Sequence, residues 1–211
     1  MLDRRVHKWF ARYWNRQLRS ENNAIRALRR EIAGGARGYV LEVGCGPGSN
    51  FEYYRNEVIR LVALDPNPYM LEIARTKPMR ISTQVELIRG QAEALPFKEG
   101  AFDTVVSTAN FCSVAWPSQG LSEIRYVLRD GGEYRFFDHV RSEDSSLLAF
   151  LQDVITPIHR RILGSGCHLN RRVGVLVQQS GFSSIDVEIR KPLPTIPMAI
   201  YRPHAVGVAR R

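Results

Sequence analysis

The sequence predicts an α/β fold of the doubly wound, Rossmann-like type, with helices on both faces of a mostly parallel sheet. Short apolar segments alternate with helical ones through residues 38–140, a pattern that produces parallel sheets covered on both faces. The first apolar segment leads directly into a glycine-rich turn, which a helix is expected to follow. The length of 211 residues and a hydrophobic fraction of 44% suit a single domain with a real core.

The expected elements can be placed in order along the chain. Buried strands are expected at residues 39–43, 60–64, 85–88, 102–106 and 134–137, and helices at 50–57, 69–76 and 121–128. Two later strand candidates, 184–189 and 205–209, have no helix between them and are expected to pair antiparallel at one edge. Residues 1–211 therefore form one domain, with a helical cap (1–37), a ligand-binding core (38–140), a lid-like helical insertion (141–172) and a C-terminal helix and hairpin (173–211).

The N-terminal segment carries most of the positive charge. Residues 1–37 contain ten Lys or Arg and three Asp or Glu, whereas the rest of the chain is nearly balanced. Apolar residues that include Trp9 and Tyr13 recur at helical spacing, so a basic amphipathic helix is expected to run to about residue 32, before Gly34 and Gly35. Such a helix could face nucleic acid, an anionic membrane or an acidic substrate; a merely solvated helix face is an equally weighted alternative.

Several classes of protein are not expected. No run of eighteen apolar residues is present, and the N-terminus lacks the apolar region of a secretory signal. The three cysteines, Cys45, Cys112 and Cys167, lie far apart in the sequence and show neither metal-ligand spacing nor a disulfide framework. Buried free thiols in a reducing compartment are the better interpretation. We therefore expect a cytoplasmic protein without a metal.

The chemistry begins at the glycine turn, Glu42-Val43-Gly44-Cys45-Gly46-Pro47-Gly48. Glycines allow the backbone to approach a ligand closely at the carboxyl end of the first strand. The spacing Gly-x-Gly-x-Gly differs from the Gly-x-Gly-x-x-Gly of dinucleotide sites. Glu42 would repel a phosphate but could organise a cationic ligand, and S-adenosylmethionine (SAM) carries a sulfonium and an ammonium group without any phosphate.

Further polar residues follow the next strands. Asp65, before Pro66, is placed to accept hydrogen bonds from both hydroxyls of a ribose; a turn-forming Asp-Pro pair is the alternative. After the third strand, the polar side chain of Gln91 or the backbone amide of Ala92 could read an adenine edge, and Ser107 ends the fourth strand. Each signal is weak alone, but their order and spacing together are specific.

Taken together, these motifs resemble those of the class I SAM-dependent methyltransferases over about residues 38–140. The resemblance implies SAM as the cofactor and a seven-stranded sheet of order 3-2-1-4-5-7-6 with an antiparallel last strand. It implies that the turn glycines approach the methionine moiety, that Asp65 holds the ribose and that residues 91–93 lie near the adenine. The expected cofactor site comprises Glu42, Gly44, Cys45, Gly46, Gly48, Asp65, Pro66, Gln91, Ala92, Glu93 and Ser107.

A narrower resemblance covers most of the chain. The segments 65–68, 111–114, 138–140, 166–171 and 202–204 are similar to those of the small methyltransferase-like thiol S-methyltransferases. This similarity implies a small thiol as the methyl acceptor, and a lid formed by the apolar insertion would predict that the acceptor is apolar. Those relatives carry an N-terminal membrane-anchoring segment where this chain has its basic helix, which could cap the pocket or contact a membrane peripherally. A quinone, a phenol or a phospholipid amine is the alternative acceptor. Nucleic acid is not expected, since residues 107–111 lack a base-methylation signature.

The acceptor side is expected at the ends of the fourth and fifth strands. Asp138 and His139 are the candidate catalytic bases, although a structural histidine is an even alternative. The candidate substrate-binding residues are Trp9, Tyr13, Phe111, Cys112 and His168. The insertion has a broad apolar side, so it could form a lid with the N-terminal aromatic residues, or simply pack on the core.

Overall fold

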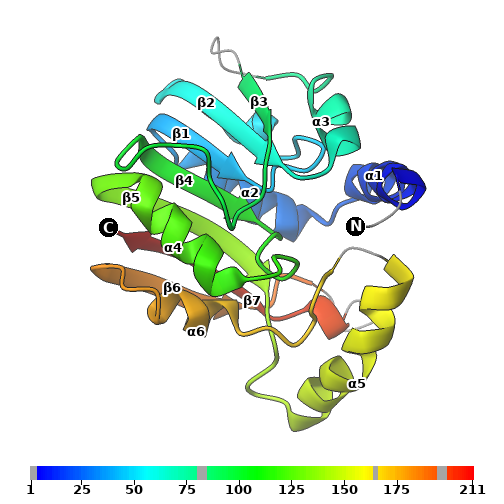
Figure 1. The fold of residues 1–211 in the computed structure, drawn as a ribbon. Helices are drawn as coiled ribbons and strands as arrows, with labels where there is room; N and C mark the ends of the chain where they lie inside the picture. Colours follow the sequence, from blue (N-terminus) through cyan, green and yellow to red (C-terminus); the bar gives the residue numbers. More distant parts are fainter. Residues whose placement is uncertain (1–3, 80–84, 164–165, 194–198) are drawn as a thin grey trace.

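The computed structural model describes residues 4–79, 85–163, 166–193 and 199–211. Its centre is a seven-stranded sheet of order β3-β2-β1-β4-β5-β7-β6 (Figure 1). The parallel strands are β1 (Gly38–Val43), β2 (Val58–Asp65), β3 (Val85–Arg89), β4 (Phe102–Thr108) and β5 (Leu128–His139). Strand β7 (His204–Arg210) runs antiparallel to both β5 and β6 (Ser184–Arg190). The expected fold class, strand order and edge pair are confirmed.

Helices cover both faces of this sheet. Two short helices, α4 (Pro117–Val127) and α6 (Val173–Gln178), pack on one face, and α2 (Asn23–Gly34) and α3 (Pro68–Ala74) pack on the other. The central strands are buried on both sides because each face meets its own apolar cluster. Two 3-10 turns, η1 (Phe51–Tyr53) and η2 (Ala199–Tyr201), complete the connections.

Two further helices stand at the edge of the sheet where α3 begins. Figure 1 shows α1 (Arg4–Arg19) and α5 (Ser146–Leu163) both beside this edge, on the right of the view. This is the carboxyl edge of the parallel strands, where ligands bind in doubly wound sheets. Among the described residues, no helix has the length and hydropathy needed to cross a membrane.

Three expectations about local structure are wrong. The N-terminal helix does not continue to residue 32: it breaks after Arg19, and α2 restarts with Asn22, whose side chain caps it by accepting from the Ala24 amide at 2.8 Å. Residues 50–57 form only the short η1 turn, because Asn50 and Tyr54 turn inward to bond a buried carboxylate. The fifth strand begins at Leu128, well before residue 134, since α4 leads directly into it.

Candidate active site

The glycine turn after β1 has the backbone conformation that its sequence suggested. Gly44, Gly46 and Gly48 have φ values of 72°, 54° and 79°, in the left-handed region that favours glycine. A Cβ at Gly44 would lie 2.2 Å from the side chain of Asn110, whereas one at Gly46 would meet nothing within 4 Å. The turn is thus closed on the Asn110 side and open beside Gly46, which leaves its main chain accessible to a ligand.

Asp65, the last residue of β2, faces this turn. Its Oδ2 accepts the Gly46 amide at 2.9 Å, and its Oδ1 accepts the Asn67 amide at 2.8 Å. The second bond is the turn chemistry that the sequence offered as an alternative, so Asp65 both shapes its own turn and stands beside the open glycine. Burial raises the pKa of Asp65 to about 6.

Glu42 lies inside the protein, beneath the turn. Its two oxygens accept from Asn50 Nδ2 at 2.9 Å and from the Tyr54 hydroxyl at 2.8 Å. Burial raises the pKa of Glu42 to about 7 against these hydrogen bonds. The carboxyl group therefore holds the chain that follows the glycine turn, a role that sequence reasoning did not anticipate.

The role of Arg29 in α2 was also not predicted from the sequence. Arg29 lies in the basic N-terminal segment, where its side chain was expected to be one more solvent-facing charge. The side chain is buried, and its Nη1 donates to Asn50 Oδ1 at 3.0 Å and to Thr108 Oγ1 at 2.8 Å. Its Nη2 pairs with Glu21 at 2.8 Å, and its guanidinium lies 5.5 Å from the centre of the Phe137 ring. The cap segment is thereby bonded to the glycine turn and to the end of β4.

The residues expected near an adenine lie together after β3. Ala92 is buried and Gln91 is exposed. Glu93 Oε1 accepts the amides of Ala115 and Trp116, at 2.9 and 3.1 Å, at the start of α4, a stabilising position for a carboxylate. Glu93 therefore joins this segment to α4.

Three other predicted cofactor residues lie at different depths. Ser107 bonds its hydroxyl to that of Tyr134 at 2.8 Å, and both side chains are fully buried between strands. Cys45 is buried in the apolar cluster under the turn, while Pro66 is exposed next to Asp65. The structure therefore brings the glycines, Asp65 and Pro66 together and places Ser107 within the sheet.

Asp138, which the sequence places on the acceptor side, lies at the end of β5 and organises the loop that follows β4. Its Oδ2 accepts the amides of Asn110 and Phe111, at 3.0 and 2.6 Å, and its Oδ1 accepts the amide of Cys112 at 3.2 Å. The loop begins at Ala109, whose φ of 50° is strained for a residue other than glycine. Asp138 therefore shapes the backbone that carries Cys112 and Phe111, and the Phe111 ring is fully buried in the core against Tyr134.

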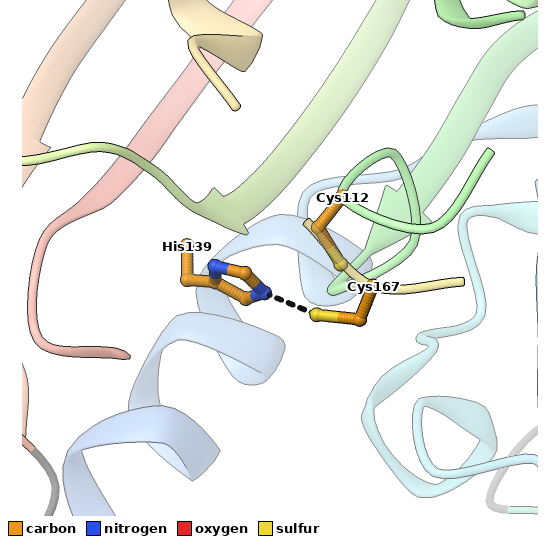
Figure 2. Close-up of side chains that lie close together, drawn as sticks. All are labelled: Cys112, His139 and Cys167. Carbon is orange, nitrogen blue, oxygen red and sulfur yellow. Dashed lines mark hydrogen bonds between the residues drawn. The ribbon is translucent and has the colours of Figure 1, made fainter. Parts of the chain in front are cut away.

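His139 lies next to two cysteines that the sequence separates widely. Its Nε2 is 3.1 Å from Cys167 Sγ, and the Cys112 side chain lies beside them (Figure 2). All three cysteines are buried and free, as expected. The expectation that they offer no metal-binding arrangement is not supported, because Cys112, His139 and Cys167 hold their ligand atoms within 4.8 Å of one another. Linear spacing could not reveal this cluster, because the sheet creates it.

In this cluster, the ionisation of each side chain depends on the charge of its neighbours. The hydrogen bond from Cys112 and the charge of His139 lower the pKa of Cys167, whereas the bond to Cys167 and burial raise that of Cys112. Burial opposes ionisation of His139, but the neighbouring Cys167 brings the net pKa of the ring above its ordinary value. Burial likewise raises the pKa of Asp138. A thiolate beside an imidazolium is the arrangement that these shifts favour.

The remaining predicted acceptor residues surround this cluster. His168 donates its amide to the Cys112 carbonyl at 2.8 Å, and Arg171 Nη1 donates to the carbonyls of Phe111 and Val114, both at 2.6 Å. Burial and Arg171 lower the pKa of His168, which favours the neutral ring. Arg171 ties the two cysteine-bearing segments together and was not anticipated from the sequence.

The aromatic residues of α1 are less enclosed. Trp9 is about half exposed and stacks on Tyr13, with 5.2 Å between the ring centres. Burial, with smaller contributions from neighbours that include Tyr13, raises the pKa of Tyr201 to about 12, and the Tyr201 ring packs edge-on against His139 with 5.6 Å between the ring centres.

Comparisons with known proteins identify relatives over both halves of the chain. A family model described as a methyltransferase domain matches residues 41–136. The human protein "Thiol S-methyltransferase TMT1B" is 35% identical over 92% of this chain and 80% of its own length. The human "Thiol S-methyltransferase TMT1A" is 31% identical over 96% of this chain and 86% of its own. A demethylmenaquinone methyltransferase of Renibacterium salmoninarum is 33% identical over 44% of this chain and 38% of its own.

Solved structures share the fold. A SAM-dependent methyltransferase from Thermotoga maritima, described as a possible histamine N-methyltransferase, aligns with a TM-score of 0.68 at 19% identity, covering 98% of each chain. A putative methyltransferase in complex with the Haloferax volcanii Trm112 activator aligns with a TM-score of 0.71 at 18% identity, covering 100% of this chain and 99% of that one. At these identities the likeness concerns the fold alone.

Proposed function

This chain belongs to the class I SAM-dependent methyltransferases and, within them, to the family of the thiol S-methyltransferases, and we propose that it methylates the sulfur of a small apolar thiol. SAM is its cofactor. The residues of the glycine turn fit that cofactor: an open main chain at Gly46 lies beside the buried acceptor oxygens of Asp65. A ribose can donate both of its hydroxyls to such a carboxylate.

One observation carries the choice of a thiol: the similarity to thiol S-methyltransferases extends beyond the cofactor-binding core. The methyltransferase domain model ends at residue 136, and the quinone methyltransferase matches under half of the chain. The two human thiol methyltransferases match more than nine-tenths of it, so the match must include acceptor-side residues beyond 136. The part of the chain beyond residue 136 contains four of the site residues described above: Asp138, His139, Cys167 and Arg171.

The reaction requires little from the protein beyond alignment of the acceptor with the methyl group and exclusion of water. Bound SAM supplies a methyl group already activated on a sulfonium, and the thiolate is the attacking form of a thiol. Asp138 fixes the loop of Phe111 and Cys112 through its three amide bonds, which positions the acceptor wall beside the glycine turn. We assign Asp138 this positioning role, and we assign His139 and the cysteines to the polar part of the acceptor site.

We also propose that α1 and α5 contact an anionic membrane from which an apolar acceptor enters. Helix α1 exposes Lys8, Arg12, Arg16 and Arg19. Helix α5 exposes a row of large apolar side chains: Leu147, Phe150, Leu151, Val154, Ile155 and Ile158. Basic charge beside exposed apolar surface is the composition of segments that lie on lipid headgroups.

The acceptor is tested with SAM labelled in its methyl group. Small alkyl thiols, a phenol, a reduced quinone and vesicles of phosphatidylethanolamine are compared at equal concentration, with Asp65→Ala as the variant that lacks the ribose-binding carboxylate. We expect a labelled thioether from the alkyl thiols and none with Asp65→Ala. Labelled product from the phenol, quinol or lipid, with none from any thiol, would replace the thiol proposal with that acceptor class.

A further inference from the structure

We propose that Cys112, His139 and Cys167 bind one zinc ion, and that the acceptor's sulfur occupies the fourth ligand position of that ion. The second half of the proposal rests on the thiol methyltransferase activity proposed above, whereas the first half does not. Figure 2 shows the three side chains converging, with the Nε2 edge of the imidazole directed at the sulfur of Cys167.

The donor atoms suit zinc in both kind and spacing. Two sulfurs and one imidazole nitrogen are typical zinc ligands, with bonds of about 2.3 Å to sulfur and about 2.0–2.1 Å to nitrogen. Two sulfurs that bind one ion in tetrahedral geometry lie about 3.8 Å apart. The ligand atoms here lie within 4.8 Å of one another, so small side-chain rotations bring them to that spacing.

The backbone already holds the three ligands in place. The Cys112 amide donates to Asp138 Oδ1 at 3.2 Å, and its carbonyl accepts the His168 amide at 2.8 Å. His139 lies in β5, where it pairs with His204 of β7. Arg171 bonds the main chain on either side of Cys112. Because these contacts are made within the protein, binding an ion requires little reorganisation of the chain.

A disulfide between Cys112 and Cys167 is the competing interpretation, and the position of His139 argues against it. His139 is buried, and its Nδ1 has no hydrogen-bond partner among the described residues, so Nε2 makes the ring's polar contact through the Cys167 sulfur. Oxidation would remove the thiol and weaken that contact, leaving a buried imidazole without a strong partner. An ion satisfies both sulfurs and Nε2 at once.

Three protein ligands leave one position open, as in catalytic zinc sites. The cluster stands at the carboxyl ends of β4 and β5, and Asn110, two residues before Cys112, packs on Gly44 of the cofactor turn. A thiol that binds zinc loses its proton to solvent. Its sulfur then forms a bond to the methyl carbon while the carbon–sulfonium bond breaks, and that electron pair neutralises the sulfonium. The products are a thioether and S-adenosylhomocysteine, with no oxidant required.

The metal is tested on the full chain, purified with a phosphine reductant in place of a thiol. We expect about one zinc per chain by elemental analysis. After removal of the metal by a chelator, we expect Co²⁺ to restore one equivalent and to give the visible bands of a tetrahedral site with a sulfur-to-cobalt charge-transfer band. Zinc-free protein that also gives no such spectrum with Co²⁺ overturns the proposal, as does a Cys112–Cys167 disulfide found by mass spectrometry in the reduced preparation.

Cysteine variants distinguish metal binding by this cluster from metal binding elsewhere on the protein. Cys112→Ser and Cys167→Ser should each weaken Co²⁺ binding about 100-fold or more, since each removes a thiolate ligand. Cys45→Ser is the matched control, because Cys45 is the third buried cysteine and lies outside the cluster; it should retain one equivalent. Equal loss in all three variants would overturn the assignment. The spectrum of the unmodified protein keeps the test decisive if a variant fails to fold.

The open position is tested without any turnover. An alkyl thiol added to the cobalt-loaded protein in the absence of SAM should intensify and shift the charge-transfer band, whereas the matching alcohol should not. A thiol that is methylated but leaves the spectrum unchanged overturns the coordination of the acceptor while leaving the proposed function intact. A spectral shift with no methylation of any thiol refutes the proposed function and not the metal site.

Discussion

Three carboxylates that follow or end strands in this protein hold main-chain amides. Asp65 accepts the Gly46 amide, Glu93 caps the start of α4, and Asp138 accepts three successive amides of one loop. An amide that donates to an ionised carboxylate makes a stronger hydrogen bond than one between neutral groups, so each of these acids holds the local shape of the backbone. The sequence identified these acids by their places after strands, but it could not show that their partners would be backbone atoms, because hydrogen bonding depends on the folded loops.

The raised pKa of Asp65 predicts a pH dependence of cofactor binding. The carboxyl titrates at about pH 6 in the free protein, and only its ionised form can accept from both ribose hydroxyls. The dissociation constant for SAM should therefore rise about tenfold as the pH falls from 7 to 5. Calorimetric titration at several pH values measures this. Asp65→Asn should bind more weakly at pH 7 and show little change with pH; a wild-type constant that stays level down to pH 5 would contradict the assignment.

Glu42 predicts a pH dependence of folding stability with a definite sign. Burial raises its pKa from 4.5 to about 7 in the folded protein, so between those values the folded state binds more protons than the unfolded state. The free energy of unfolding should therefore fall as the pH rises from 5 to 8, by up to about 3 kcal/mol from this group.

Urea unfolding of the wild type and Glu42→Gln across that range measures the effect. The neutral amide cannot ionise, so the variant should lose much less stability than the wild type as the pH rises. A smaller decline from Asp65, whose pKa is raised in the same direction, should persist in the variant. Parallel curves for the two proteins would show that Glu42 is not the responsible group.

Among the elements, those with strong local signals were predicted well. Apolar runs located all five parallel strands, and the lack of a helical sequence pattern between the last two strand candidates predicted their antiparallel pairing, which β6 and β7 show. The break between α1 and α2 was missed because the capping signal of Asn22 was overlooked, and the short η1 turn was missed because contacts distant in sequence decide it. Residues 50–54 read as helical in sequence, yet Asn50 and Tyr54 bond Glu42 across the turn. Tertiary hydrogen bonds there outweigh a weak local preference.

Arg29 should be the main polar anchor of α2. Its replacement by Ala leaves Asn50, Thr108 and Glu21 without their buried partner, which should cost about 3 kcal/mol of unfolding free energy. Arg30→Ala is the matched control: Arg30 is exposed and its guanidinium lies over the ring of Tyr53, at 5.8 Å, so its loss should cost about 1 kcal/mol or less. Thermal or urea unfolding compares them, and equal destabilisation would contradict the anchoring role.

At the scale of the molecule, the net charge of +9 is concentrated at one end of the chain. The sheet contributes the cofactor side, while α1 and α5 stand at its carboxyl edge with exposed basic and apolar side chains (Figure 1). The sequence predicted a basic amphipathic helix and an apolar insertion, but it could not decide whether their apolar residues would be buried. The exposure of α5 depends on its neighbours, which local periodicity does not encode.

Membrane contact predicts selective binding to anionic vesicles. The protein should sediment with phosphatidylserine-containing vesicles more strongly than with pure phosphatidylcholine, and added salt should weaken that binding because surface charges are screened. Arg12→Glu combined with Arg16→Glu should reduce it at least about tenfold, at roughly 1 kcal/mol per basic residue removed. Phe150→Asp tests the apolar contribution of α5. Equal sedimentation with neutral and anionic vesicles would contradict the proposal.

Because Asp138 holds three main-chain amides, main-chain atoms determine the backbone path of the loop after β4. Those side chains of the loop that do not pack in the core can therefore differ without altering that path. Phe111 is fully buried against Tyr134, and Cys112 belongs to the cysteine cluster. Replacing a half-buried side chain such as that of Ser113 would then change the surface beside the cluster on a constant frame. A protein built in this way can acquire a new acceptor by single substitutions while its cofactor chemistry is preserved.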